Sequence, residues 1–465
     1  MSRHTIRMRW AAAFFAGSFC MTFAHSTDAP GIVGKDDWLF YRYELSEPAD
    51  AAQTKESIEL IGRLNKVLVA NGVSMAVAMV PLKMRLYAEH LPDSIKLSDY
   101  VSGNYESMRK SLEAAGVAAI DLNGPFLVNA KRNPEATLFF RLDTHWTLTG
   151  AMLAAETIKA GVEANATLKK ALDSTPAEAF SMSVGKRQRP SKGRDLIDQL
   201  PPNSGTFAPE QFLPVSVIRA QAPTEELLGN HSTTGIALVG SSYSRDWTGF
   251  VDGLRYTLQR DILSVAVGAD QGSWVGLESY LRDDAFQTNT PKLLIWEMPE
   301  RDMRAPPDYR FRDARYVVNN TEWLLKASAW VQRSCKPSTV TAKVASVGLG
   351  TQASHLKGND VTAGPTNENE FIEFAFDKPI DKLDYLVANV LTAGSKNLII
   401  EGSGPGVATR RFTLQVAGDE ATHALKTPLP SISSGFTKFR VYPGKTQRFS
   451  FQQLQLCRQP EDLLK

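Results

Sequence analysis

Hydrophobic and polar residues change their spacing in a regular order between residues 54 and 299. Apolar positions three or four residues apart predict helices at 54–72, 104–116, 147–164 and 247–261. Short apolar runs predict buried strands at 75–81, 117–122, 235–242, 262–268 and 292–299. Because strands and helices alternate along the chain, the pattern favours an α/β fold, with a mostly parallel sheet covered by helices on both faces.

Residues 165–230 interrupt this alternation. They are rich in Pro, Ser and Gln and include the basic run KRQRPSKGR at 186–194. We therefore predict an inserted loop region at this place. A charged run of this kind is usually a solvated surface, and the alternative is that it contacts an anionic ligand.

The chain changes character after Cys335. Short strand-like runs separated by turn residues follow at 339–350, 370–377, 383–391, 396–402, 410–418, 436–444 and 447–456. Few helical patterns lie between them. This part of the chain therefore favours a β-sandwich of about 130 residues behind the α/β part.

The first 24 residues carry a different signal. Three arginines (Arg3, Arg7 and Arg9) precede an apolar stretch at 10–24. A positive segment, an apolar segment of about 15 residues and a small residue before a polar start are typical of a cleaved secretory signal peptide. An uncleaved membrane anchor is the alternative, although the apolar stretch is short for a spanning helix.

Removal of this segment would change how the composition is interpreted. The 465 residues carry a net charge of +2, which argues against a dedicated nucleic-acid binder, and residues 25–465 alone carry −1. Cys20 would also be lost, so that Cys335 and Cys457 remain. In an exported chain two cysteines most simply form a disulfide, which here would join the start of the predicted sandwich to its end. Two unrelated thiols are the alternative.

The segment LVGSSYS at 238–244 is the sharpest candidate for chemistry. A serine at a turn between a strand and a helix, here Ser242, lies at the carboxyl end of the sheet, where open α/β sheets build their sites. The following helix would offer backbone N–H groups to an oxyanion. The segment lacks the full G-x-S-x-G elbow, so the alternative is that its small residues only permit a tight turn.

A second candidate is RLDTHWT at 141–147. Asp143 and His145 are two positions apart, so in an extended segment they would point to the same side. The carboxylate could then hold one imidazole nitrogen while the other faces a substrate. The alternative is a structural pair at a helix cap, since Thr147 could itself cap the next helix. Metal binding is disfavoured because no second His or Cys lies at ligand spacing.

Together, Asp143, His145 and Ser242 would form a triad in which the imidazole activates the serine for attack on an ester carbonyl. The order Asp, His, Ser differs from that of the common α/β hydrolases. Triads of the same geometry nevertheless occur in several chain orders.

These motifs resemble the periplasmic alginate O-acetyltransferases of the AlgX/AlgJ type. The resemblance is carried by DDWLFYRYEL (36–45), VPLKMRLY (80–87), LDTHWTLTGA (142–151), LVGSSYS (238–244) and LLIWEMPERDM (293–303). It implies an SGNH-hydrolase-like domain whose elements are circularly permuted, which accounts for the Asp-x-His preceding the Ser. The β-rich tail resembles the carbohydrate-binding module of the AlgX branch, whereas W-E-x-P-E-R is closer to AlgJ.

The resemblance also implies residue roles. Ser242 matches the nucleophile, His145 the base and Asp143 the orienting acid. The backbone N–H groups of Ser242 and Gly272 would form the oxyanion hole.

The third oxyanion donor and three candidate substrate-binding cations lie outside the triad. The Asn of ordinary SGNH esterases has no match, and Glu300 and Arg301 lie near its place. Lys83, Arg85 and Arg301 stand at the ends of predicted strands, where each is a candidate for contact with a uronate carboxylate. Individually, each is more typical of an ordinary surface cation. No metal and no cofactor are expected.

The sequence thus predicts a signal peptide at 1–24, an acetyltransferase domain at 27–333 with the insertion at 165–230, and a carbohydrate-binding β-sandwich at 335–460. The expected reaction is transfer of an acetyl group through acyl-Ser242 onto an exported anionic polysaccharide, which the resemblance identifies as alginate. The resemblance further implies a membrane-bound system that supplies the acetyl group, and other export proteins as partners. The alternatives are an acetylesterase, a different polymer such as cellulose, and a non-catalytic polysaccharide-binding scaffold.

Overall fold

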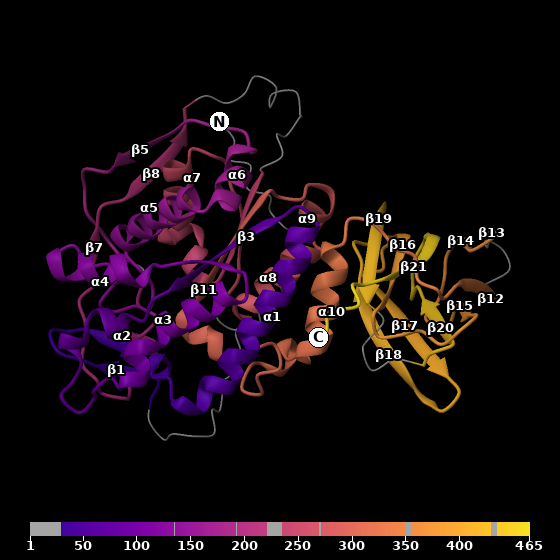
Figure 1. Ribbon diagram of the computed structural model, residues 1–465, viewed down its shortest axis with the longest axis horizontal. Coiled ribbons are helices and arrows are strands. Elements are labelled where there is room, and N and C mark those ends of the chain that lie inside the picture. The colour runs from indigo at the N-terminus through magenta and orange to yellow at the C-terminus, as the bar shows by residue number, and fades with distance from the viewer. Residues whose placement is uncertain are drawn as a thin grey trace.

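Two lobes with different secondary structure make up the described chain (Figure 1). The computed structural model describes residues 29–133, 135–191, 193–220, 235–268, 271–349, 355–428 and 435–465. The predicted signal peptide lies outside these ranges. Among the helices within them, none is both long and apolar enough to cross a membrane.

The first lobe is built on a five-stranded sheet in the order β10-β9-β11-β3-β4, with every neighbouring pair parallel. Its strands are β3 (Ser74–Val80), β4 (Ala118–Ile120), β9 (Ile236–Gly240), β10 (Leu263–Ala266) and β11 (Leu293–Pro299). All five were predicted from their apolar runs, and the parallel sheet is confirmed. A short antiparallel pair, β1 (Gly31–Val33) and β2 (Leu39–Tyr41), precedes the sheet.

Helices cover both faces of this sheet because alternate residues of each strand point to opposite sides. In β9, Ile236 and Leu238 face one apolar core, whereas Ala237 and Val239 face the other. The first core is shared with α2 (Lys83–Leu86), α4 (Asn123–Arg132), α5 (Leu148–Ala164), α6 (Ala166–Asp173) and α7 (Phe250–Leu258). The second is shared with α1 (Ala51–Ala70), α3 (Asp99–Ala114), α8 (Gly272–Arg282), α9 (Asp284–Thr288) and α10 (Asn320–Val331).

The segment 165–230 is more ordered than a loop region. It begins with α6, which Asn165 caps by accepting hydrogen bonds from the N–H groups of Thr167 and Leu168. Two antiparallel ribbons follow where the segment is described, one of β5 (Phe180–Val184) with β8 (Val215–Arg219) and one of β6 (Arg189–Pro190) with β7 (Gln211–Phe212). The prediction of loop alone was therefore wrong here: the strands FSMSV and VSVIR alternate apolar and polar residues, but they are short and stand in a segment rich in Pro, Ser and Gln.

The second lobe is a β-sandwich of two antiparallel sheets, as predicted. One sheet has the order β12-β15-β20-β17-β18 and the other β13-β14-β21-β16-β19, and their inner faces share one apolar core. The strands are β12 (Ala342–Gly348), β13 (His355–Lys357), β14 (Asp360–Ala363), β15 (Phe371–Phe376), β16 (Asp384–Ala393), β17 (Asn397–Gly404), β18 (Val407–Gln415), β19 (Asp419–Pro428), β20 (Lys438–Tyr442) and β21 (Phe449–Arg458). The strands β13, β14 and β19 were not predicted.

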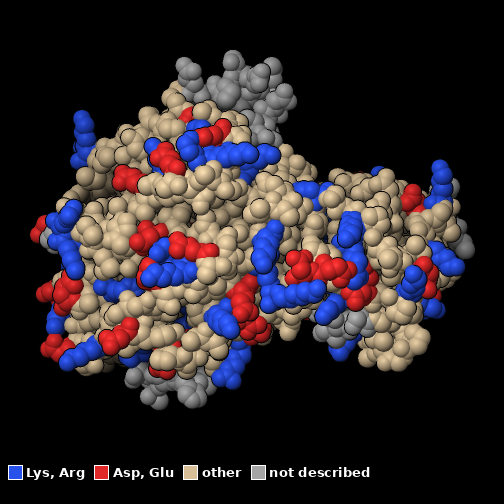
Figure 2. Space-filling view, viewed as in Figure 1, with Lys and Arg blue, Asp and Glu red and all other residues tan. Residues whose placement is uncertain are grey.

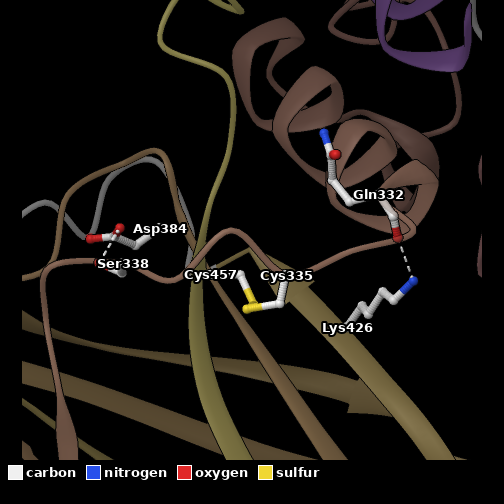
Figure 3. Close-up of a disulfide and its surroundings, with 6 residues drawn as sticks. All are labelled: Gln332, Cys335, Ser338, Asp384, Lys426 and Cys457. Carbon is white, nitrogen blue, oxygen red and sulfur yellow. Dashed lines mark hydrogen bonds between the residues drawn. A yellow bond between two sulfur atoms is a disulfide. The ribbon is translucent and has the colours of Figure 1, made fainter. Parts of the chain in front are cut away.

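The two lobes meet where α10 packs against β19 (Figure 1). The indole N–H of Trp330 donates to the backbone oxygen of Lys426 at 2.9 Å, and the Lys426 ammonium donates to the backbone oxygen of Gln332 at 2.7 Å. Figure 3 shows this second bond beside the disulfide between Cys335 and Cys457, which confirms the predicted pairing. The sandwich is thus closed at the point where the chain enters it.

Loss of the disulfide should destabilise the second lobe. The bond joins residues 122 positions apart, so in the chain-entropy picture it stabilises the fold by about 5 kcal/mol as an upper figure. The double change Cys335→Ser and Cys457→Ser should therefore lower the denaturant midpoint of the sandwich. Urea unfolding followed by far-UV circular dichroism would measure this shift, because no tryptophan lies after residue 330 to report on the sandwich. The wild-type protein under reducing conditions is a second sample. An unchanged midpoint in both samples would contradict the expectation.

Candidate active site

The carboxyl end of β9 turns sharply at Gly240 and carries Ser242 into a short 3-10 helix, η6 (Ser242–Ser244). The turn needs glycine at its start: a Cβ at position 240 would lie 2.1 Å from Ser244 Oγ and 2.5 Å from an oxygen of Glu297. The hydroxyl of Ser241 caps η6 by accepting from the N–H of Tyr243. The small residues of this motif therefore also permit a tight turn, as the alternative interpretation predicted.

A hydrogen-bonded chain of three side chains lies at this turn. His145 Nε2 is 2.7 Å from Ser242 Oγ, and His145 Nδ1 is 2.5 Å from Asp143 Oδ1. All three residues are buried. A carboxylate at Nδ1 favours the tautomer in which Nδ1 carries the proton, and Nε2 is then free to accept from the serine hydroxyl.

The backbone around His145 explains how this pair forms. Asp143 Oδ1 also accepts from the backbone N–H of His145 at 2.9 Å, so the carboxylate holds both the main chain and the ring of the same residue. Residues 141–145 form a bend and not the extended segment that we predicted. The helix cap is supplied separately, because Thr147 Oγ1 accepts from the N–H of Gly150 at the start of α5. His145 is therefore not needed as a cap.

A further acid, Asp195, reaches the same place from the inserted segment. Its backbone N–H donates to Asp143 Oδ2 at 2.9 Å, and its carboxylate accepts from the N–H and the hydroxyl of Thr144 at 2.7 and 2.5 Å. Gly193 leaves room for this contact, since a Cβ there would lie 3.1 Å from Asp143 Oδ2. Sequence reasoning missed Asp195, because a single acid inside a predicted loop gives no pattern.

The two acids respond differently to this environment. Burial alone would raise the pKa of Asp143, but the hydrogen bond and charge of His145, together with the N–H of Asp195, hold the pKa below its usual value. Burial, followed by the charge of Asp143, raises the pKa of Asp195. Ligand atoms of Asp143, His145 and Asp195 lie within 4.8 Å of one another, which is also metal-binding spacing. In the structure Nδ1 of His145 is taken up by Asp143, and the Asp195 carboxylate by Thr144.

The side chain of Glu297 packs against Gly240 at the turn, in the space that a Cβ at position 240 would occupy. One carboxylate oxygen accepts from the backbone N–H of Ser241 and from the hydroxyl of Ser244, each at 2.8 Å, and the other accepts from the Ser241 hydroxyl at 2.9 Å. Glu297 is fully buried, and burial raises its pKa to about 7 in spite of these three donors. The turn that carries Ser242 is folded around this carboxyl group.

Residues 32–300 match the SGNH hydrolase-like domain of the acetyltransferase AlgX family. This match spans more than half of the chain. The chain belongs to the SGNH hydrolase-like AlgX acetyltransferase family.

The relatives of this chain include both AlgJ and AlgX proteins. A probable alginate O-acetylase AlgJ of Pseudomonas fluorescens is 33% identical over 282 residues, which is 58% of this chain and 68% of that protein. The alginate biosynthesis protein AlgX of the same species is 24% identical over 399 residues, which is 84% of this chain and 77% of that protein. The match to AlgJ thus has the higher identity, whereas the match to AlgX is longer.

An AlgJ domain and an AlgX protein are also among the solved structures that are similar to this chain. The O-acetyltransferase domain of Pseudomonas putida AlgJ covers 64% of this chain and 99% of its own, with a TM-score of 0.53 at 26% identity. Pseudomonas aeruginosa AlgX covers 92% of this chain and 94% of its own, with a TM-score of 0.61 at 17% identity. The AlgX fold therefore includes both lobes described above.

Lys83 and Arg85, two of the cations predicted to bind substrate, direct their N–H groups to partners inside the fold. The ammonium of Lys83 is buried and donates to the backbone oxygens of Leu39, Arg141 and Asp143 at 2.6, 2.9 and 3.0 Å. Burial lowers its pKa to about 8. Because an ammonium has three N–H donors and all three are used, the prediction that Lys83 contacts a uronate is wrong. Lys83 instead holds the backbone that leads into the Asp143 bend.

Arg85 has a similar internal role. It forms a buried ion pair with Glu300 and also donates to Asn123 Oδ1 at 2.9 Å and to the backbone oxygen of Val101 at 3.0 Å. Glu300 in turn accepts from the N–H of Leu82. The prediction that Arg85 contacts substrate is wrong for the same reason, and Glu300 is the partner of Arg85 and supplies no oxyanion donor.

The role predicted for Arg301 stays a prediction. The oxyanion role predicted for Gly272 does not fit the structure, because its backbone N–H already donates to the backbone oxygen of Gly268 at 3.1 Å. The Arg301 guanidinium lies 5.4 Å from the ring of Tyr41 and 5.7 Å from that of Tyr243, and it donates to the Tyr243 hydroxyl at 3.4 Å. Tyr243 donates in turn to the backbone oxygen of Thr144, which links Arg301 to the segment that carries His145. Gly272 begins α8 with a φ of 76°. That conformation favours glycine at this helix start.

Proposed function

We propose that the protein transfers acetyl groups onto alginate through an acyl-enzyme at Ser242. The observation that carries this proposal is the 2.7 Å contact between His145 Nε2 and Ser242 Oγ, with Asp143 on the other imidazole nitrogen, in a member of an acetyltransferase family. A buried serine in contact with a buried, carboxylate-held imidazole is the arrangement that activates a hydroxyl nucleophile.

The transfer would take place in two steps. First, Ser242 Oγ attacks the carbonyl carbon of the donor ester while His145 Nε2 accepts the hydroxyl proton, which then passes to the departing donor oxygen. In the second step a sugar hydroxyl attacks the acyl-Ser242 carbonyl and gives its proton to His145 Nε2. That proton returns to Ser242 Oγ as the new ester leaves. The backbone N–H of Ser242 is our candidate for stabilising both oxyanions.

The polymer is assigned from relatives whose names specify alginate. Charged side chains of both signs are interspersed over the described surface shown in Figure 2, so an anionic polymer would need local binding sites. One candidate lies on the outer face of the first sandwich sheet. There the Phe371 and Tyr442 rings are 5.7 Å apart, with the guanidinium of Arg440 4.5 Å from the first ring and that of Arg411 5.2 Å from the second.

Flat aromatic rings flanked by arginines suit a chain of uronate sugars, because the rings contact apolar sugar faces and the guanidinium groups pair with carboxylates. Glu373 and Glu401 already pair with these arginines, so a polymer would bind by sharing them. We further propose that the protein works in the periplasm, receives acetyl groups from a membrane-bound system and acts alongside other export proteins. The amino-terminal pattern and the disulfide support this location.

The decisive experiment incubates the purified protein with an acetyl ester, with and without mannuronate oligomers. Transfer predicts that the oligomers gain acetyl groups by mass spectrometry, and that Ser242→Ala abolishes this gain while leaving oligomer binding. Equal release of acetate with and without oligomers, and no gain in mass, would instead identify an acetylesterase. Acetylation at the wild-type rate by the Ser242→Ala protein would exclude Ser242 as the nucleophile.

A further inference from the structure

Trp247 differs from every other tryptophan that the structure describes. The other six are between 0% and 7% exposed, whereas Trp247 is 49% exposed. The six are Trp38, Trp146, Trp274, Trp296, Trp323 and Trp330. Leaving half of an indole in water forgoes the apolar burial that stabilises the fold at the other positions. An exposed residue of this kind is a candidate for contact with a ligand.

Its position is next to the proposed base. The ring centroids of Trp247 and His145 are 4.9 Å apart, and the two ring planes are nearly perpendicular at 72°. Trp247 lies in η7 (Asp246–Thr248), which follows η6 directly, so it is carried by the same turn as Ser242. The exposed part of the indole therefore forms an apolar wall beside the Ser242–His145 pair.

The backbone that holds Trp247 is well fixed. The hydroxyl of its neighbour Thr248, which is buried, lies 2.8 Å from the backbone oxygens of both Tyr243 and Arg245, and its one proton is shared between these two acceptors. Gly249 then adopts a φ of 76° and begins α7. Exposure of Trp247 thus does not arise from a loosely attached loop. The ring is held in place with one side against His145 and another side open.

We propose that Trp247 is the stacking platform for the sugar ring that accepts the acetyl group. This rests on the proposed transferase function and adds the place where the acceptor binds. The face of an indole is electron-rich, and the C–H groups of one pyranose face are weakly positive, so the two surfaces attract as well as exclude water. A sugar ring stacked here brings its hydroxyls to the side of His145, which must accept the hydroxyl proton in the second step.

The neighbouring charges fit a uronate as the occupant. Arg245 and Asp246, which precede Trp247, are both exposed, and Arg245 follows η6, the short helix that carries Ser242. A guanidinium recognises a carboxylate with two parallel hydrogen bonds, which a neutral sugar cannot accept in this way. Asp246 would disfavour a second carboxylate close by. Arg245 is thus the candidate partner for the carboxylate of the uronate stacked on Trp247.

A direct binding measurement tests the platform without chemistry. Short mannuronate oligomers are titrated by calorimetry into the full-length Ser242→Ala protein, and into the same protein carrying Trp247→Ala or Trp247→Tyr. Loss of stacking should weaken binding about tenfold with Ala, whereas Tyr should keep most of the affinity. Phe212→Ala, which removes another exposed aromatic ring, is the control and should bind as Ser242→Ala does. Equal affinity of all these variants would overturn the proposal.

Kinetics separate acceptor binding from support of His145. In the enzyme with Ser242 intact, Trp247→Ala should raise the acceptor KM about tenfold and lower the ratio of acetyl transfer to ester hydrolysis. Recovery of that ratio in Trp247→Tyr supports stacking. A proportional loss of transfer and hydrolysis would show that Trp247 only positions His145, and would overturn the proposal. Failure of the proposed function itself would be seen separately, as oligomers that bind and never gain acetyl groups.

Discussion

Replacing Asp143 with asparagine should lower kcat for acetyl transfer by about 10⁴-fold while the protein remains folded. The asparagine amide can donate a hydrogen bond to Nδ1 of His145, which favours the tautomer with the proton on Nε2. That proton faces Ser242 Oγ, so the ring can no longer accept from the serine. Steady-state kinetics with saturating donor and acceptor would measure the loss, and circular dichroism would check the fold.

Asp195→Asn is the matched control for this change. Asp195 contacts Thr144 with its carboxylate, which also lies 3.7 Å from His145 Nδ1, outside hydrogen-bond distance. It touches Asp143 only through its backbone N–H, which the substitution leaves in place. Its effect on kcat should therefore be smaller by at least about 100-fold. Similar losses in the two variants would show that the acids act as one unit, and would contradict the assignment of Asp143 as the sole orienting acid.

Removal of the Glu297 side chain should have the second largest effect. In Glu297→Ala the N–H of Ser241 and the hydroxyls of Ser241 and Ser244 lose their shared acceptor in a buried site. The turn should then relax into the space left behind and move Ser242 Oγ away from His145. Displacement of a reacting atom by about 1 Å costs about 100-fold in rate, so we expect a loss of this size in kcat together with lower stability. Glu297→Gln keeps an acceptor for the Ser241 N–H and should retain more activity than the alanine variant.

The pH dependence of stability distinguishes the charge of Glu297 from its shape. Burial raises its folded-state pKa from 4.5 to about 7, so the folded state binds the proton more tightly than the unfolded chain. The resulting stabilisation is complete below pH 4.5 and is lost as the pH rises through 7, a change of about 3 kcal/mol. Urea unfolding at pH 5 and pH 8 should therefore show a steeper decline for the wild-type protein than for Glu297→Gln. Parallel declines would mean that Glu297 does not titrate in this range.

Much of the fold follows from local patterns in the chain. Strands buried on both faces, such as 74–80 and 293–299, are nearly continuous apolar runs, and the helices between them carry one or two apolar faces. The ribbons of the inserted segment escaped prediction because their strands are only two to five residues long, so that even the alternation in FSMSV and VSVIR is too brief to stand out from the polar residues around it. β19 escaped for a related reason: it lies at a sheet edge, where few apolar side chains are needed.

The candidate site shows a different limit. Ser242, His145 and Asp143 stand in motifs whose residue types point to their chemistry, and the structure brings the three together. Lys83 and Arg85 were misjudged because charge at a strand end is usually solvated, and nothing in the sequence reveals that backbone oxygens and Glu300 surround them. Residues such as Asp195 and Glu297 act through distant partners, so only the three-dimensional arrangement identifies them.

The junction between the lobes has a consequence for how a long polymer would be handled. Trp330 and Lys426 join the end of α10 to β19, and the disulfide fixes the start of the sandwich to its last strand, which limits how far the outer sheet face can move relative to Ser242. A polymer held on the sandwich would raise the effective concentration of its own sugars at Ser242, and only those at a matching distance along the chain would reach it. Acetyl groups would then appear at preferred intervals, with the geometry of the junction acting as a molecular ruler.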